Sequence, residues 1–592
     1  MLRNALIVLA LVAVVALPFA LKPKNSLLAD ADETLVIISP HNEAIRYEFA
    51  RGFRDWYKAR TGKVARIDWR TPGGTTEIAR YLASEYQAPF EFYWRRKQRL
   101  RWTELAARSF DDSKIKIGTD PSKDMEPQMA RRAFLTSNVG IGIDLFFGGG
   151  SFDFAQQAAA GRLVDTGFVR EHPEIFNDTP TGIPQTLGGQ PFRDKDGAWV
   201  GTVLSAFGVC YNVEGMRRVA ERGAQLVEPE HRAAAREHAN ATPNRWEDLA
   251  DPACYAQVAL ADPNQSGSVA KAFEMIIQQQ IQQQHFAEPL RLGPAGTFDP
   301  LLPPAQTILG VEGSQDSNTF KGQLEPSLEA VETAKINGWA EAMRTIQRMG
   351  ANARYFTDAA TKIAIDVSDG DAAIGMAIDF YGRFEGESSR DPRTGQERMH
   401  YFSPVGGTSV DADPIGVLRG APHPELARAF MEYVLSVDGQ KLWNFRVGTP
   451  GGPQKYALRR SPIRRELYAE EFKQFRADPD VYPYEEAKSF TYHPEWTGSL
   501  FNPIRFVLRV MCIDPHDEAR KAWGELIAAR FPPEAMKTFE DVSAVSYAEA
   551  RGRIAETLRN PDKLAETRLA AELTERFRAQ YRRAGELARA GK

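Results

Sequence analysis

Apolar runs of strand length alternate with longer stretches of helical spacing at the start of this chain. Residues 34–39 form a β-branched run, and apolar residues recur with helical spacing across 44–60. Residues 64–69 predict a second strand, and another helix is predicted from Ile78 onward. Because strands and helices alternate, the chain is predicted to begin as an α/β fold with a mostly parallel sheet and right-handed crossovers.

A central apolar run at 372–378 follows a polar turn with a glycine at 366–371. Such a run predicts a strand buried on both faces. It ends on Asp379, Phe380 and Tyr381, before a charged loop. A carboxylate and a phenol at the end of a buried strand are typical of ligand sites in α/β proteins. The alternative is a core strand whose last residues merely meet solvent.

Several further loops at predicted strand ends or helix starts carry glycine and hydroxyl residues. A helix start offers free backbone N–H groups and a positive dipole end, which favour an anion, and glycine lets the backbone approach a ligand closely. A simple helix N-cap is the alternative for the threonines. With the central strand, these loops give the candidate ligand-binding residues His41, Asn42, Gly74, Thr75, Thr76, Gly149, Gly150, Ser266, Gly267, Ser268, Asp379 and Tyr381.

The length and composition indicate a globular protein of several domains. The chain has 592 residues, of which 43% are hydrophobic and 26% charged, and a single core rarely exceeds ~250–300 residues. A net charge of -4 gives no basic footprint for nucleic acid. Aromatic and basic residues crowd 90–102, within a stretch of weak pattern at 87–132 that we interpret as an inserted subdomain or lid. Single-stranded nucleic acid is the alternative partner for that cluster.

The N-terminus predicts export. An uncharged apolar stretch at 5–21 follows Arg3 and is broken by a proline, as in a signal peptide. It is either cleaved or kept as an anchor, since its length is at the lower limit for a membrane span. The protein is therefore expected in the periplasm. Of the three cysteines, Cys210 and Cys254 are the better pair for a disulfide, and buried free thiols are the favoured alternative.

Several motifs in consistent order resemble the extracellular solute-binding proteins of ABC importers, family 1, grouped with the iron(III)-binding proteins. The resemblance covers roughly 34–468. Its most specific pieces are Leu-Ala-Asp-Pro-Asn-Gln-Ser-Gly-Ser at 260–268, the block at 370–381, Ser-Pro-Val-Gly-Gly-Thr at 403–408, and the stretches 420–430 and 435–443.

The resemblance implies two α/β lobes of the type II periplasmic binding fold, with hinge crossovers near 201–212 and 401–416 and the ligand between the lobes. The expected order is a signal peptide or anchor (1–32), lobe I (33–200, with the insertion 87–132), lobe II (201–402), a return to lobe I (403–468) and a helical C-terminal extension (469–592). The extension is predicted to pack outside a lobe and leave the cleft open. A monomer that delivers its ligand to an ABC permease in the inner membrane is expected.

Iron(III) binders of this kind use a histidine, a glutamate and two adjacent tyrosines. His41 matches the histidine, the glutamate position falls in the glycines of 148–150, and Phe380 replaces one tyrosine. A metal set of His41, Asp379 and Tyr381 is thin for a hard trivalent ion. The expected ligand is therefore a small anion, or iron(III) carried as a metal chelate. Two alternatives stay open: a hydrolase using Ser266 or an Asp379–His41 pair, and a scaffold without ligand.

Overall fold

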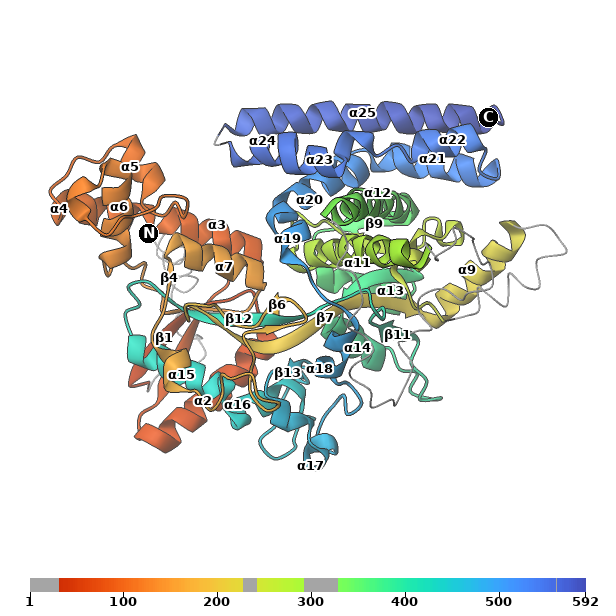
Figure 1. The fold of residues 1–592 in the computed structure, drawn as a ribbon. Coiled ribbons are helices and arrows are strands. Elements are labelled where there is room, and N and C mark those ends of the chain that lie inside the picture. The colour runs from red at the N-terminus through yellow and green to blue at the C-terminus, as the bar shows by residue number, and fades with distance from the viewer. Residues whose placement is uncertain (1–30, 227–241, 292–327, 561) are drawn as a thin grey trace, which may run out of the picture.

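The computed structural model describes residues 31–226, 242–291, 328–560 and 562–592, so that nearly all of the predicted export signal lies outside the described residues. An eleven-stranded sheet runs through the molecule, and its main path has the order β2–β1–β3–β12–β7–β10–β8–β9 (Figure 1). None of the helices in the described ranges combines the length and apolar character that a membrane span requires. Helices cover both faces of the sheet, as expected for an α/β protein.

Lobe I is built on three parallel strands. Strand β1 pairs with β2 on one side and with β3 on the other, both in parallel. The strands and helices of this lobe are β1 (Glu33–Ile38), α2 (Glu43–Thr61), β2 (Ala65–Arg70), α3 (Thr75–Glu85), β3 (Leu145–Phe147), α7 (Ser151–Ala160), β4 (Leu163–Val164), α8 (Phe168–Glu171), β5 (Thr186–Leu187), β6 (Gln190–Pro191), α15 (Pro424–Leu435), α16 (Val437–Asn444), β13 (Ser461–Pro462), α17 (Glu470–Lys473) and α18 (Pro483–Glu486).

Lobe II repeats the arrangement with another three parallel strands. Strand β8 pairs in parallel with β10 and with β9. Its elements are α9 (Val213–Leu226), β8 (Val258–Ala261), α11 (Gly267–Arg291), α12 (Leu328–Asn352), β9 (Ala353–Thr357), α13 (Ala360–Asp369), β10 (Ile374–Ile378), α14 (Asp379–Ser388) and β11 (Met399–Phe402).

Two antiparallel strands join the lobes. The first half of β7 (Val200–Asn212) pairs with β12 (Val410–Leu418), and its second half pairs with β10 and β11. Strand β7 therefore belongs to both lobes, and β12 continues to β3 of lobe I. These strands lie where the crossovers were predicted, and the two-lobe α/β fold class with its helical C-terminal region is confirmed.

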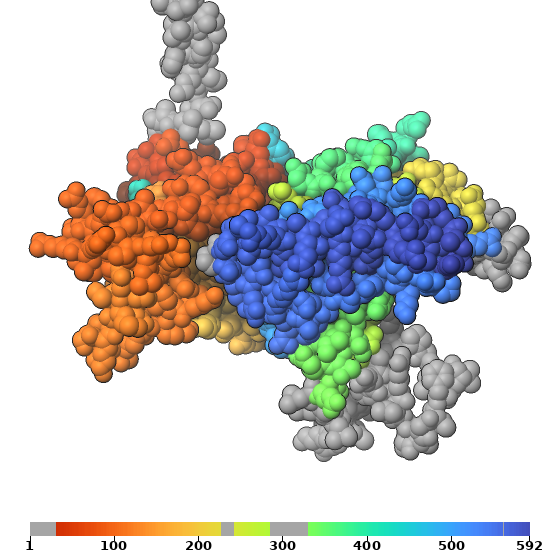
Figure 2. Space-filling view, turned by 90° about the horizontal axis from the view of Figure 1, so that it is seen from above, coloured from red at the N-terminus to blue at the C-terminus, as the bar shows by residue number. Residues whose placement is uncertain are grey.

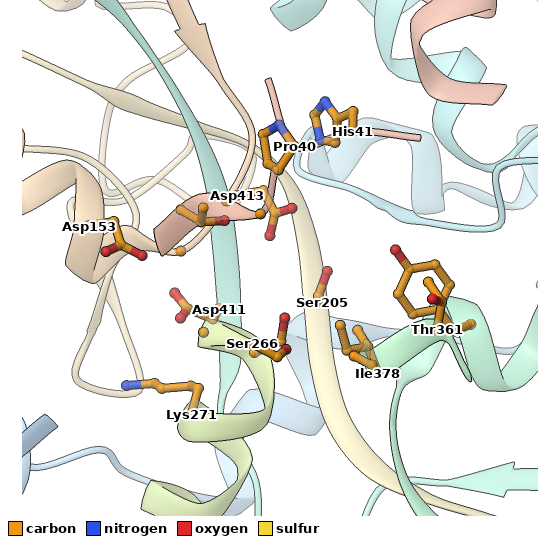
Figure 3. Close-up of a pocket in the computed structure, with 18 of the residues that line it drawn as sticks. Pro40, His41, Asp153, Ser205, Ser266, Lys271, Thr361, Ile378, Asp411 and Asp413 are labelled. Atoms are coloured by element: carbon orange, nitrogen blue, oxygen red, sulfur yellow. The ribbon is translucent and has the colours of Figure 1, made fainter. Parts of the chain in front are cut away.

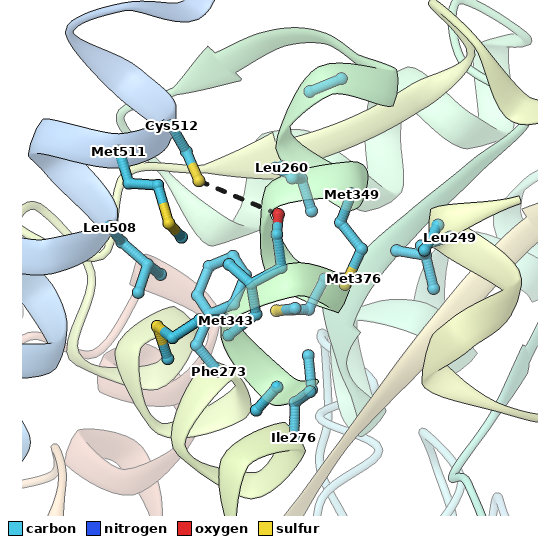
Figure 4. Close-up of a cluster of buried hydrophobic side chains, with 14 of the residues drawn as sticks. Leu249, Leu260, Phe273, Ile276, Met343, Met349, Met376, Leu508, Met511 and Cys512 are labelled. Atoms are coloured by element: carbon cyan, nitrogen blue, oxygen red, sulfur yellow. Dashed lines mark hydrogen bonds between the residues drawn. The ribbon is translucent and has the colours of Figure 1, made fainter. Parts of the chain in front are cut away.

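Each lobe has its own core. Phe49, Phe147 and Trp443 are fully or almost fully buried in lobe I, where the rings of Phe49 and Trp443 lie 4.4 Å apart. The core of lobe II is rich in methionine, with Met343, Met349, Met376 and Met511 around Phe273 (Figure 4). Cys512 donates a hydrogen bond to the carbonyl of Ile346 across 3.9 Å in this core. All three cysteines are buried and free, so the predicted alternative of free thiols is confirmed.

The C-terminal extension belongs to the core of lobe II. Trp339 of α12 donates to the carbonyl of Val545, and Trp523 donates to Asn352, each across 2.8 Å. Figure 2 shows the extension covering one face of lobe II and reaching the edge of lobe I. Its helices are α19 (Pro494–Thr497), α20 (Phe501–Leu508), α21 (His516–Ala528), α22 (Pro533–Phe539), α23 (Tyr547–Glu549), α24 (Ala555–Arg559) and α25 (Lys563–Arg589).

The stretch 87–132 forms a small helical subdomain on lobe I. Its helices are α4 (Gln87–Arg96), α5 (Glu104–Ser109) and α6 (Glu126–Thr136). They enclose a separate aromatic cluster in which the ring of Phe110 lies 4.7 Å from that of Phe90 and 5.0 Å from that of Phe134. The aromatic residues of this stretch are therefore largely core residues.

Two local predictions are wrong. The charged loop expected after Tyr381 is helix α14, because Asp379 occupies its first turn. The sequence at 140–147 also predicts a strand, but only Leu145–Phe147 forms one (β3). Just before it, Asp144 accepts hydrogen bonds from the backbone N–H groups of Val36 and His423, at 2.9 and 2.6 Å.

Candidate ligand-binding site

A cavity of about 460 Å³ lies between the two lobes, at the carboxyl ends of their parallel strands (Figure 3). Such clefts are where α/β folds bind ligands. Lobe I contributes the loops after β1, β2 and β3, and lobe II contributes the starts of α11, α13 and α14. Ser205, on the strand that joins the lobes, also lines it.

Ten of the twelve predicted ligand-binding residues line this cavity. They are His41, Asn42, Gly74, Thr75, Gly149, Gly150, Ser266, Gly267, Ser268 and Tyr381. That they bind a ligand stays a prediction.

Thr76 and Asp379 do not line the cavity. The Thr76 hydroxyl accepts a hydrogen bond from Arg505 Nη2 at 2.8 Å. Asp379 is buried, where it accepts from Arg383 Nη2 at 2.6 Å and from the backbone N–H of Phe380 at 2.8 Å. Its carboxylate is therefore used inside lobe II.

His41 is a buried histidine whose two ring nitrogens have no hydrogen-bond partner within the described residues. Its ring packs edge-on against Phe147 at 4.6 Å. Burial, with the nearby positive charge of Arg460, holds its pKa well below the usual value, so the ring is neutral near pH 7. A neutral imidazole offers one donor and one acceptor to whatever fills the cavity.

The triple glycine after β3 makes room for side chains of the protein itself. Gly148 and Gly149 have φ angles of 88° and 115°, which disfavour other residues. A Cβ atom on Gly148 would lie 2.4 Å from the His41 ring, and one on Gly149 would lie 2.5 Å from Thr75. The glycines therefore position His41 and Thr75, in place of the close ligand approach that the sequence suggested.

Three carboxylates of the cavity were missed by the sequence reasoning: Asp153 and Asp411, which are buried, and Asp413, which is partly buried. Asp411 and Asp413 lie on β12, two residues apart, so their side chains point to the same face of the strand. The Asp-x-Asp alternation was the available signal, but the sequence pattern predicts a strand only from Pro414 to Leu418, after both carboxylates. Figure 3 shows the three side chains beside Ser205 and Ser266.

Asp413 is compensated by Arg460. Arg460 Nη2 donates to Asp413 Oδ2 and to the hydroxyl of Ser205, each across 2.6 Å. The guanidinium also lies over the ring of Phe380, 4.3 Å from its centroid. Burial raises the pKa of Asp413, while the guanidinium acts in the opposite direction. The two residues form a hydrogen-bonded ion pair in which Arg460 is buried and Asp413 partly so.

Asp411 accepts hydrogen bonds from the Ser151 hydroxyl at 3.1 Å and from the N–H of Ala412 at 2.9 Å. Burial raises the pKa of its carboxyl. Asp153 is 7% exposed and, in the described part of the chain, has neither a hydrogen bond nor an ion pair. Burial raises the pKa of Asp153 to about 6. Asp153 thus presents an uncompensated carboxylate to the cavity.

On the lobe II side, Lys271 is already paired. Its Nζ lies 2.9 Å from Glu274 Oε2 and 3.8 Å from the centroid of the Tyr492 ring. Burial raises the pKa of Tyr381, so that its phenol is a protonated hydrogen-bonding group near pH 7.

The helix starts around the cavity fall into two groups. In lobe I, α3 and α7 carry Glu77 and Asp153 in their first turns. A Cβ on Gly74 would lie 3.0 Å from Glu77 Oε2, so this carboxylate folds back over the start of α3. In lobe II, α11 and α13 have no acidic residue in the first turn. The dipoles of α11 and α13 are therefore the ones left for an anion.

The C-terminal extension reaches the cavity and does not lie only on the outside of one lobe, whereas its leaving the cleft open stays a prediction. Phe501 lines the cavity and lies 4.5 Å, ring to ring, from Phe152 of lobe I. Arg505 donates from Nε to the carbonyl of Pro263 in lobe II at 2.7 Å, as well as to Thr76 in lobe I. Helix α20 therefore connects the two lobes beside the cavity.

The metal set and the hydrolase arrangements expected from the sequence are not assembled. Among the residues that the structure describes, no group of three His, Cys, Asp or Glu side chains is placed to hold a metal ion. Asp379 lies off the cavity on Arg383, and the Ser266 hydroxyl accepts from the N–H of Val269 at 3.4 Å. With His41 unpartnered, neither Ser266 nor Asp379 forms a nucleophile–base pair with it.

Residues 219–444 match the family model of a bacterial extracellular solute-binding protein. The resemblance seen in the sequence is thus confirmed over this part of the chain. No curated protein sequence matches the chain.

Solved structures similar to this chain are periplasmic binding proteins. Iron-bound HitA from Pseudomonas aeruginosa is 14% identical, with 80% of this chain and 98% of that chain covered and a TM-score of 0.40. AfuA from Actinobacillus pleuropneumoniae, with fructose-6-phosphate bound, is 13% identical, with 69% and 82% covered and a TM-score of 0.38. FutA from Trichodesmium, with iron and citrate, is 14% identical, with 81% and 99% covered and a TM-score of 0.36. At such values these likenesses carry no argument about the ligand.

Proposed function

We propose that this protein is the solute-binding component of an ABC importer. It holds a small polar ligand with an anionic group between its lobes and presents the closed form to a membrane permease. The observation that carries the proposal is the cavity itself, because it lies where the two lobes meet across β7 and β12. A ligand that contacts both walls stabilises the closed form by its differential affinity for that form.

The anionic group is assigned to lobe II. Ser266, Gly267 and Ser268 stand at the start of α11, and Ala360 and Thr361 stand at the start of α13, all on the cavity. Backbone N–H groups, hydroxyls and the dipoles of two helices without an acidic residue in the first turn suit a carboxylate or phosphate. The loop before α3 was also expected to bind an anion, but Glu77 occupies that position. Iron(III) is not carried forward, because Asp379 is engaged away from the cavity.

Capture in the periplasm and delivery to an inner-membrane permease complete the proposal. The match of residues 219–444 to a family of extracellular binding proteins supports both. The segment 5–21 supports export by its sequence alone.

Native mass spectrometry of the protein, isolated from the periplasm without dialysis, tests this function. We expect a stoichiometric small-molecule adduct that is released on denaturation. Ser268→Tyr should abolish the adduct by filling the cavity, whereas Ser84→Tyr, at an exposed position of α3, should retain it. An adduct that persists in Ser268→Tyr, or a fully empty wild-type protein whose scattering profile never changes with periplasmic extract, would contradict the proposal.

A further inference from the structure

The two walls of the cavity differ in charge. Lobe I contributes four carboxylates to the described cavity lining and one cation, Arg460, which is committed to Asp413. The positive charge of Lys271 also acts on Asp411, without forming an ion pair with it. Lobe II contributes Lys271, already paired with Glu274, and Asp358, which is solvent-exposed. Negative charge therefore gathers on one wall without full compensation by the chain.

On the lobe I wall, Asp153 is the carboxylate with the least compensation by the described part of the protein. Its carboxylate is more than nine-tenths buried, lines the cavity and has no partner in the described ranges. The closest cationic side chain, Arg505, donates to Thr76, Pro263 and Asn264 instead. An ionised carboxylate in this position has lost water and gained nothing in return, which is costly unless a ligand supplies the positive charge.

Asp411 extends the same acidic wall. Ser151 and Ala412 each donate one hydrogen bond to it, but its charge is not neutralised by an ion pair. A carboxylate can accept about four hydrogen bonds, so Asp411 keeps acceptor positions for a ligand. Neutral His41 on the same side adds unpartnered ring nitrogens.

Across the cavity, the start of α11 faces Asp153. A Cβ atom on Gly267 would lie 3.8 Å from Asp153 Oδ2. Asp153 therefore lies within van der Waals range of the α11 start, so the two walls meet at this point, and one small molecule in the cavity can touch the acidic wall of lobe I and the helix starts of lobe II. A ligand with a single charged group would satisfy only one of these walls.

We propose that the ligand is dipolar: a cationic ammonium group lies against Asp153 and Asp411 of lobe I, and an anionic group lies at the starts of α11 and α13 of lobe II. This inference rests on the proposed function and specifies its substrate class. The ligand closes the protein because each charged group binds a different lobe. A simple anion would leave Asp153 uncompensated when the lobes close.

The test uses three matched probe series of equal chain lengths: straight-chain amino acids with the amine on the terminal carbon, the carboxylates without the amine, and the alkylamines without the carboxylate. Calorimetric titration gives affinity, and small-angle X-ray scattering gives closure. We expect one amino acid length to bind and close the protein. Its amine-free and carboxylate-free counterparts should bind roughly tenfold to a hundredfold more weakly, as expected for loss of a charge-assisted hydrogen bond.

Asp153→Asn should remove the preference for the amine and leave carboxylate affinity unchanged. Asp196→Asn is the matched control, because Asp196 is an exposed carboxylate of lobe I. Asp411→Asn is the second variant, and melting curves establish that each variant folds.

The outcomes distinguish a failure of the dipolar ligand from a failure of the proposed solute-binding function. Equal binding of amino acids and amine-free carboxylates overturns the dipolar ligand and leaves the proposed function standing. The same holds if Asp153→Asn and Asp411→Asn both keep the wild-type preference. If alkylamines bind as tightly as the amino acids and also close the protein, the anionic group at the starts of α11 and α13 is overturned. If none of the three series binds, the dipolar ligand is overturned. If, in addition, the protein isolated from the periplasm carries no adduct, the proposed function is overturned too.

Discussion

Asp413, which is partly buried, and Asp153, which is buried, are two carboxylates of one cavity with opposite surroundings. Asp413 has a guanidinium and forms a 2.6 Å hydrogen bond with it, whereas Asp153 has no partner in the described structure. Removing one partner of an ion pair leaves a charge without a counterion, which destabilises the folded state. Within the described residues, Asp153 is in that situation already in the wild-type protein. Asp413 therefore belongs to an ion pair within the protein, whereas Asp153 is the carboxylate that remains unpaired in the described ranges and could meet the proposed ligand.

The largest effect on stability is expected from Arg460→Met. This substitution leaves Asp413, like Asp153, without a cationic partner among the described residues. Loss of the guanidinium leaves the partly buried Asp413 without its partner and should lower the free energy of unfolding by about 3 kcal/mol, the lower end of the range for buried pairs. Chemical denaturation at neutral pH measures it. Adding Asp413→Asn in the same chain should recover much of the loss, and a single variant as stable as wild type would refute this account of the pair.

A pH series on the ligand-free protein comes next. The pKa of Asp153 rises from 3.8 to about 6 on folding, so between these values the native state binds more protons than the unfolded state. Stability should therefore fall as pH rises through this window, by up to roughly 3 kcal/mol. Asp153→Asn should remove this component and be more stable than wild type above pH 6. A wild-type protein and variant with parallel pH profiles would count against it.

Arg505→Met should weaken the link between the lobes beside Asp153. Three hydrogen bonds to neutral acceptors are lost, and we expect about 1.5–3 kcal/mol of destabilisation with a more open scattering profile. Losing this nearby cation should also raise the pKa of Asp153 further. Arg568→Met, at an exposed position on α25, is the control. An unchanged distribution of lobe separations would mean that α20 does not restrain the lobes.

Thr76→Val should give the smallest effect. It removes one acceptor of Arg505 and keeps the side-chain shape, so about 0.5–1.5 kcal/mol is expected. Thr61→Val, at an exposed helix end, is the matched control. Combining Thr76→Val with Arg505→Met should add little, and full additivity would show that the two residues act independently.

The sequence sufficed for the order of strands, the crossovers and the loops at the strand ends, because hydrophobic periodicity and turn residues are local signals. The partners of the cavity were not local. Arg460 reaches Asp413 across 47 positions, and Arg505 reaches Thr76 across 429. Asp153 looked like an ordinary first-turn helix residue, and only tertiary burial gives it a perturbed charge. Asp379 shows the reverse, since its place at a strand end suggested a ligand site that Arg383 instead neutralises.

The buried thiols of lobe II allow the opening of its core to be measured. Cys210, Cys254 and Cys512 donate weak hydrogen bonds to main-chain carbonyls, and burial raises the pKa of each. Since thiolate is the reactive species, alkylation of the native protein must await an excursion that exposes the core. Their labelling rates therefore report how often the hinge strand, the region near α9 and the C-terminal helices each part from that core.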